Sequence, residues 1–122
     1  MQIVELVKQG KKPLDIITRD SVRNMIIADL AMGGSTNSFL HILALANAAE
    51  IDVTLKDFEE LSYQIHQIVK LEPSSAITMS QFYNAGGVSA VLKFLMRDVS
   101  LFKDTIGVTM QKTSAILLLN TD

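Results

Sequence analysis

The feature that most constrains this chain is a series of helix start and stop signals that divides it into short segments. Three threonines stand where a helix should begin, and two of them are followed three positions later by a capping-box partner: Thr18, Thr54 with Asp57, and Thr78 with Gln81. Two glycine pairs stand where a helix should end: Gly33–Gly34 and Gly86–Gly87. Between these signals the apolar residues recur at helical spacing. The sequence therefore predicts a mainly α fold, with helices over about 2–9, 19–32 and 37–49, after 54, after 78 and from about 88.

The helical pattern is regular to about residue 98 and weakens beyond it. A chain of 122 residues with 48% apolar side chains can form one folded domain. We therefore expect residues 1–98 to be a helix-rich segment and residues 99–122 to be a separate tail, either a strand or disordered. In this tail Ile106 and Val108 suggest a strand, and 114–119 is unusually apolar. The first helix lacks a capping signal, so we expect the natural chain to extend upstream.

Composition removes several classes of function. The net charge is −2 and the basic residues are scattered, which argues against a nucleic-acid partner. No apolar run approaches the roughly 18 residues of a membrane span, and the N-terminus does not resemble a signal peptide, so we expect a cytoplasmic protein with no membrane partner. The absence of cysteine excludes a disulfide, a thiolate nucleophile and a cysteine-ligated metal. His41 and His66 fall in different helical patterns, which argues against zinc.

The spacing of the apolar residues also predicts which faces are buried. The helix over 37–49 is apolar almost all round, apart from Ser38 and His41 near its start, and such a helix usually packs on several sides. Four residues line the predicted buried face of the helix over 19–32: Val22, Met25, Ile26 and Leu30. Four more define the face of the helix after Thr54: Phe58, Leu61, Ile65 and Ile68. Four methionines are expected to be core filling: Met25, Met32, Met79 and Met96.

One connection carries chemical content, and we call it the GGSTN turn: Gly33, Gly34, Ser35, Thr36 and Asn37. Its glycines allow a ligand to approach the backbone closely, and the following helix offers unpaired N–H groups to an anion. His41 lies one turn further on. The alternative is a tight corner between two helices, whose hydroxyl groups only cap the second helix. Physical arguments alone favour the corner over a carboxylate or phosphate site.

Asp29 is the second unusual residue, because its spacing from Val22 places a carboxylate on the apolar stripe. A buried carboxylate needs hydrogen-bond donors, and the nearest are the N–H groups of residues 33–35. An aspartate that braces this turn is the more common interpretation, and a catalytic aspartate is the alternative. His41, likewise, is more often a core histidine than a ligand.

Several segments resemble the dihydroxy-acid dehydratases and their phosphogluconate and sugar-acid dehydratase relatives. The most specific is the stretch ADLAMGGSTN at 28–37, followed by Leu40 and His41; shorter matches at 3–6, 13–19, 52–58, 73–74 and 85–88 keep the same order. This chain departs from the family at Ser75, where a glycine is usual, and over 114–122, which reads as either a frameshift or a foreign tail.

The resemblance implies a hydro-lyase that removes water from a 2,3-dihydroxy carboxylic acid and gives a 2-keto acid. In that family an iron–sulfur cluster and a magnesium ion assist the reaction, and their ligands and the serine base belong to segments outside this match. The resemblance therefore implies the helix-rich part of a larger α/β N-terminal domain. It assigns no catalytic residue, metal ligand or cofactor to this chain, which alone should be inactive.

The resemblance raises the weight of the binding interpretation of the GGSTN turn. We expect the substrate-binding residues to be Gly33, Gly34, Ser35, Thr36, Asn37 and His41. The expected partners are a small hydroxylated carboxylic acid and further copies of the chain. Two alternatives stay open: a standalone helical module that binds a small anion, and a structural helical piece that associates with itself.

Overall fold

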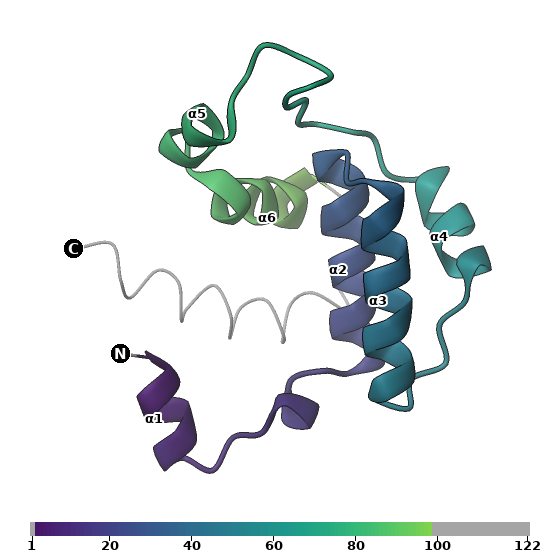
Figure 1. The fold of residues 1–122 in the computed structure, drawn as a ribbon, viewed down its shortest axis with the longest axis vertical. Helices are drawn as coiled ribbons and strands as arrows, with labels where there is room; N and C mark the ends of the chain where they lie inside the picture. Colours follow the sequence, from purple (N-terminus) through teal and green to yellow (C-terminus); the bar gives the residue numbers. More distant parts are fainter. Residues whose placement is uncertain (1, 99–122) are drawn as a thin grey trace.

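A computed structural model describes residues 2–98, and all the regular structure in this range is helical (Figure 1). The six α-helices and one short 3-10 helix are α1 (Gln2–Lys8), η1 (Pro13–Asp15), α2 (Arg19–Met32), α3 (Thr36–Ala48), α4 (Leu55–Ser62), α5 (Met79–Asn84) and α6 (Gly87–Asp98). The predicted mainly α class is confirmed. The expected strand near Ile106 and the apolar stretch over 114–119 lie outside the described residues.

The predicted signals mark where the helices start and stop. Thr18 adopts an extended conformation before α2, and its side chain accepts a hydrogen bond from the Ser21 N–H at 3.2 Å. The predicted capping boxes of α4 and α5 are both present. Gly10, shortly after the end of α1, has φ 68°, in the left-handed region. These local signals therefore predicted helix boundaries to within about one residue at most positions.

Helix α2 is the centre of the fold. It packs against α3, α4 and α6, and in Figure 1 it lies side by side with α3 while α4 and α6 flank the pair. Six of its residues are buried: Val22, Asn24, Ile26, Ile27, Ala28 and Ala31. The predicted face was therefore partly wrong, because Met25 is 38% exposed and Leu30 is only partly buried. Small and β-branched side chains instead form the stripe against which the neighbouring helices pack.

Helix α3 contradicts the prediction that it packs on several sides. Only Ile42 and Ala46 are buried, while Leu40 is 65% exposed. Phe39 of α3 contacts α4: its ring centroid lies 4.6 Å from that of Phe58. One face of α3 is therefore in the core, with Phe39 and Leu43 partly buried at its edges, while Leu40 lies on the surface.

Helix α4 closes one side of the core with Phe58 and Leu61, which are 3% and 4% exposed. The Asp57 carboxylate accepts hydrogen bonds from the Thr54 N–H at 2.7 Å and the Thr54 hydroxyl at 2.9 Å. These bonds, with a smaller contribution from the Arg19 charge, lower the pKa of Asp57 despite slight burial. The predicted helix was too long, because α4 ends at Ser62. Ile65 is buried beyond its end, whereas Ile68 is 40% exposed.

Residues 71–98 form the other side of the core. The chain turns after Leu71, where the Ser74 N–H donates to the Leu71 carbonyl at 2.9 Å. Val91 and Leu95 of α6 are buried against the core. Of the four methionines predicted to be core filling, Met32 and Met96 are partly buried, whereas Met25 and Met79 are exposed. Among the described residues, no helix is long and apolar enough to cross a membrane.

Candidate functional site

The GGSTN turn is a sharp corner between α2 and α3. Gly33 ends α2 in the left-handed conformation at φ 69°, where an L side chain would be strained. Its N–H group lies within hydrogen-bond reach of the Asp29 and Leu30 carbonyls, and the Gly34 N–H donates to the Asp29 carbonyl at 2.9 Å. Three residues later the chain is helical again. The corner is thus specified by local geometry, as the sequence predicted.

Asp29 braces this corner, but through its main chain and not its carboxylate. Its carbonyl accepts the hydrogen bonds of the turn, whereas Oδ2 is buried and has no hydrogen-bond partner among the described residues. The expected bonds from the turn to Oδ2 are therefore absent. The carboxylate fills the space beside Gly34, where a Cβ would overlap it. Gly34 is required by this close approach, since its φ lies outside the left-handed region.

The polar residues of the turn lie on the surface at the start of α3. Ser35 is the N-cap residue, yet its side chain makes no capping hydrogen bond. Thr36 and Asn37 occupy the first two helical positions and are exposed. N–H groups in the first turn of a helix have no acceptor within the helix. The hydroxyl groups here therefore do not perform the capping function that the simple-corner interpretation required.

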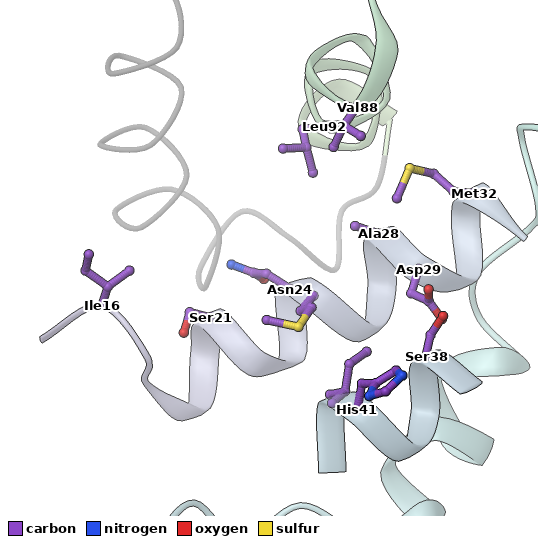
Figure 2. Close-up of a pocket in the computed structure, with 12 residues that line it drawn as sticks. Ile16, Ser21, Asn24, Ala28, Asp29, Met32, Ser38, His41, Val88 and Leu92 are labelled. Atoms are coloured by element: carbon purple, nitrogen blue, oxygen red, sulfur yellow. The ribbon is translucent and has the colours of Figure 1, made fainter. Parts of the chain in front are cut away.

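A pocket of about 590 Å³ opens beside this corner, between α2, α3 and α6. Asp29, Ser38 and His41 all line it, and Figure 2 shows the Asp29 carboxylate directed toward Ser38, with His41 further along α3. The rest of the wall is mainly apolar and includes Met32 and Leu92. The structure thus brings His41 and Asp29 to one pocket. The residues of the GGSTN turn lie at its edge and do not line it.

Sequence analysis did not identify two polar residues near the corner. Asn24 is 4% exposed, lines the pocket, and has no hydrogen-bond partner for its Nδ2 or Oδ1 atom among the described residues. It projects from α2 away from Ser38 (Figure 2). Its burial could have been predicted from spacing. Asn24 lies four residues before Ala28 and seven before Ala31, which places it on the buried face of α2.

The second missed residue is Gln67, in the extended segment after α4. The Ile68 and Val69 N–H groups donate to the Ala31 carbonyl at 2.8 and 3.2 Å, which ties this segment to the last turn of α2. The Gln67 side chain lies against Gly33: its Cδ atom is 2.7 Å from the position that a Cβ at residue 33 would take. No local sequence signal predicts this contact, because it joins segments far apart in the chain.

The side chains present do not fit an iron–sulfur cluster. Such clusters are held by cysteine thiolates, and the sequence contains no cysteine. Within residues 2–98 there is also no group of three histidine, aspartate or glutamate side chains placed to hold a metal ion. Near the corner, this chain's own residues can supply hydrogen bonds and a close approach to the backbone.

Comparison with known proteins identifies relatives over most of the chain. It is 45% identical over 109 residues to a dihydroxy-acid dehydratase of Clostridium novyi, covering 89% of this chain and 20% of that protein. Dihydroxy-acid dehydratases of Polynucleobacter asymbioticus and Streptococcus thermophilus are 41% and 40% identical, over 94% and 88% of this chain and 20% and 19% of their own length. The chain therefore spans about a fifth of the length of these relatives.

The match to the family itself is nearly complete along the chain. The family model described as dihydroxy-acid/6-phosphogluconate dehydratase N-terminal matches residues 1–115, which include every described helix and the GGSTN turn. The resemblance inferred from the motifs is thus confirmed by an independent comparison. The chain belongs to the dihydroxy-acid/6-phosphogluconate dehydratase N-terminal family.

Proposed function

We propose that this chain is part of a hydro-lyase that converts a 2,3-dihydroxy carboxylic acid to a 2-keto acid. The observation that carries the proposal is the family match over residues 1–115, with relatives named dihydroxy-acid dehydratase. The reaction needs residues beyond this chain, because the chain corresponds to only a fifth of those relatives. By resemblance, the whole enzyme also carries an iron–sulfur cluster and magnesium on residues outside this chain.

Within this enzyme the corner between α2 and α3 binds the substrate. The N–H groups of Thr36 and Asn37 suit a carboxylate, because they have no acceptor within α3 and lie at the positive end of the helix dipole. The Asp29 carboxylate, which lines the adjacent pocket, suits a hydroxyl donor. A 2,3-dihydroxy acid carries both groups on adjacent carbons. The proposed binding residues are Gly33, Gly34, Ser35, Thr36, Asn37 and His41, and we include Asp29 in the proposal because it lines the adjacent pocket.

An independent module for small anions is a weaker candidate. The Asp29 carboxylate lies directly beside Gly34, and none of the residues lining the pocket is lysine or arginine. A negative charge at this position opposes binding of a free phosphate or sulfate. A ligand that also donates hydroxyl hydrogens compensates for this charge, which favours the hydroxy acid.

We further propose that the protein functions in the cytoplasm as a homo-oligomer. The surface of α3 supports a homo-oligomer, since Leu40 is 65% exposed and both Ala44 and Ala48 are exposed beside it. Apolar surface of this kind favours association. Sedimentation of the purified chain at high concentration measures self-association directly, and a clean monomer would contradict the proposed homo-oligomer.

Two measurements test the catalytic proposal. The isolated chain should form no keto acid from a dihydroxy acid above a buffer blank. In a full-length family member, replacing Thr36 and Asn37 together with alanine should lower kcat/KM with little change in Tm. Thr18→Ala is the matched control, because it removes a capping bond and should lower Tm with kinetics intact. Unchanged kcat/KM in the double variant would refute the binding role of the turn.

A further inference from the structure

We propose that Asn24 bonds to an extended main-chain segment that comes from the part of the enzyme outside this chain and lies in the pocket between α2, α3 and α6. Asn24 is 4% exposed and lines this pocket, yet neither its Nδ2 nor its Oδ1 atom has a hydrogen-bond partner among the described residues. The inference rests on the proposal that the chain is part of a longer hydro-lyase, but not on the binding role of the GGSTN turn.

The Asn24 amide needs a partner that its own helix does not provide. The other buried residues of α2 are all apolar. A carboxamide carries two N–H donors and an oxygen acceptor, and burying these atoms unpaired destabilises a fold. Both atoms are closed off from solvent, so water does not supply the missing bonds. Since nearly all buried polar side chains of native proteins are paired, the partner comes from outside the described residues.

The pocket is long enough to hold more than the proposed substrate. The residues that line it run from Ile16, which precedes α2, to Met32, the last residue of that helix. The 14 residues of α2 span about 21 Å. Asp29 and Ser38 lie beside the corner, where the hydroxy acid is proposed to bind, whereas Asn24 projects away from Ser38 (Figure 2). The part of the pocket around Asn24 is therefore left for a second occupant.

The chemistry of this part of the pocket favours a peptide segment. A peptide group offers one acceptor and one donor, which suit the Nδ2 and Oδ1 atoms of Asn24. The terminal torsion of asparagine is broad, so the amide can turn toward a segment that lies in the pocket. The walls are mainly apolar and include Leu92 of α6, and none of the described residues that line the pocket is lysine or arginine. Apolar side chains of a strand suit these walls, whereas an anionic partner finds no countercharge.

The source of the segment is the remainder of the enzyme. This chain corresponds to 20% of the length of its relative from Clostridium novyi, so most of such an enzyme lies outside it. A second copy of this chain is a different source, and it would bond to Asn24 in the purified chain as well. The two sources therefore differ in the stability of the purified chain when the amide is removed.

The test is Asn24→Leu in two proteins: the 122-residue chain, and a full-length family member with asparagine at the matching position. Leucine keeps the branching at Cγ but has no polar atom. In the purified chain the change removes two unpaired atoms and should raise Tm by roughly 4–8 °C. In the full-length enzyme it removes bonds to the segment and should lower Tm by about 2–4 °C.

The matched control in the purified chain is Asn47→Leu, which makes the same change at an exposed position of α3. It measures the gain from helix propensity alone and should raise Tm by no more than about 2 °C. A fall in the Tm of the purified chain with Asn24→Leu, or no rise beyond this control, would overturn the proposal, because the amide would then be bonded within the chain or by a second copy.

A rise in Tm in both proteins would also overturn the proposal, because no other part of the enzyme would then bond to Asn24. A full-length variant that does not fold counts as the expected loss only where the purified chain gains stability from the same change. Unchanged Tm with lower kcat/KM in the full-length variant would assign Asn24 to the substrate and overturn the proposal. The proposed function fails separately, if the full-length wild-type enzyme forms no keto acid, and that result leaves the Tm comparison intact.

Discussion

Helices α2 and α3 have similar lengths and lie side by side, yet they are buried to very different extents. α2 contains several charged residues, and six of its 14 residues are buried. α3 is much more apolar, and only two of its 13 residues are buried. The difference shows that the arrangement of neighbours, more than apolar content, decides which helix is central. α2 is contacted by three other helices, so its small side chains are enclosed, whereas α3 leaves Leu40 on the surface.

The largest expected effect comes from truncating one side chain on each helix. Ile26→Ala removes a side chain that is 1% exposed and should lower the free energy of unfolding by about 2–5 kcal/mol. Leu40→Ala removes one that is 65% exposed and should change it by less than about 0.5 kcal/mol. Chemical denaturation followed by circular dichroism measures both. Equal losses would show that α3 is as enclosed as α2.

The corner between the two helices gives the next largest effect. Gly34→Ala places a Cβ against the Asp29 carboxylate and should destabilise the chain by about 1–3 kcal/mol, the usual cost of overpacking. Because the clash is specific, Asp29→Ala in the same chain should recover most of this loss. A double-mutant cycle measures the coupling. Additive effects of the two substitutions would mean that Gly34 is required for some other reason.

Removing the N-cap side chain should have a smaller effect on stability, and this effect should differ between α2 and α3. Thr18→Ala removes the oxygen that accepts from the Ser21 N–H and should cost about 1 kcal/mol. Ser35 holds the same position before α3 but makes no capping bond, so Ser35→Ala should cost less than about 0.5 kcal/mol. Thermal unfolding of the two variants under the same conditions makes the test. A larger loss from Ser35→Ala would reverse the expected order.

The smallest effect concerns α4, which covers one side of α2. The pKa of Asp57 is lowered by its bonds from Thr54, so its ionised form stabilises the folded state. This stabilisation is present above the ordinary pKa of 3.8 and is lost as the pH falls through the lower value in the folded state. The Tm advantage over Asp57→Asn should therefore shrink on acidification from about pH 6 to about pH 2. A Tm difference that stays constant across this pH range would contradict a stabilising role of the ionised Asp57.

The helix boundaries could be predicted because the signals for them are local. Thr18, Thr54 and Thr78 each bond to groups within three residues, and the glycine conformation at residue 33 depends on its own backbone. The corner of the candidate site was located by the same kind of signal. Its position in the chain required no knowledge of the rest of the fold.

Burial and the surroundings of the site could not be predicted in the same way. Whether Leu40 is covered depends on which helices pack beside α3, and a helix that is apolar all round does not indicate which face is used. The side chain that lies against Gly33 comes from Gln67, more than thirty residues away along the chain. For Asp29 the sequence correctly indicated the turn as its partner, but the carbonyl makes the hydrogen bonds and the carboxylate makes the contact.

The Ala31 carbonyl has a consequence for the order in which the chain folds. It accepts hydrogen bonds from the N–H groups of Ile68 and Val69, the first of which lies 37 positions later in the chain. Closing a loop of that length costs entropy on the order of 3 kcal/mol, which local helix formation does not require. We therefore expect the bonds to the Ala31 carbonyl to form after the two helices of the corner. On this expectation the corner forms first from neighbouring residues, and the segment at 67–69 joins it later.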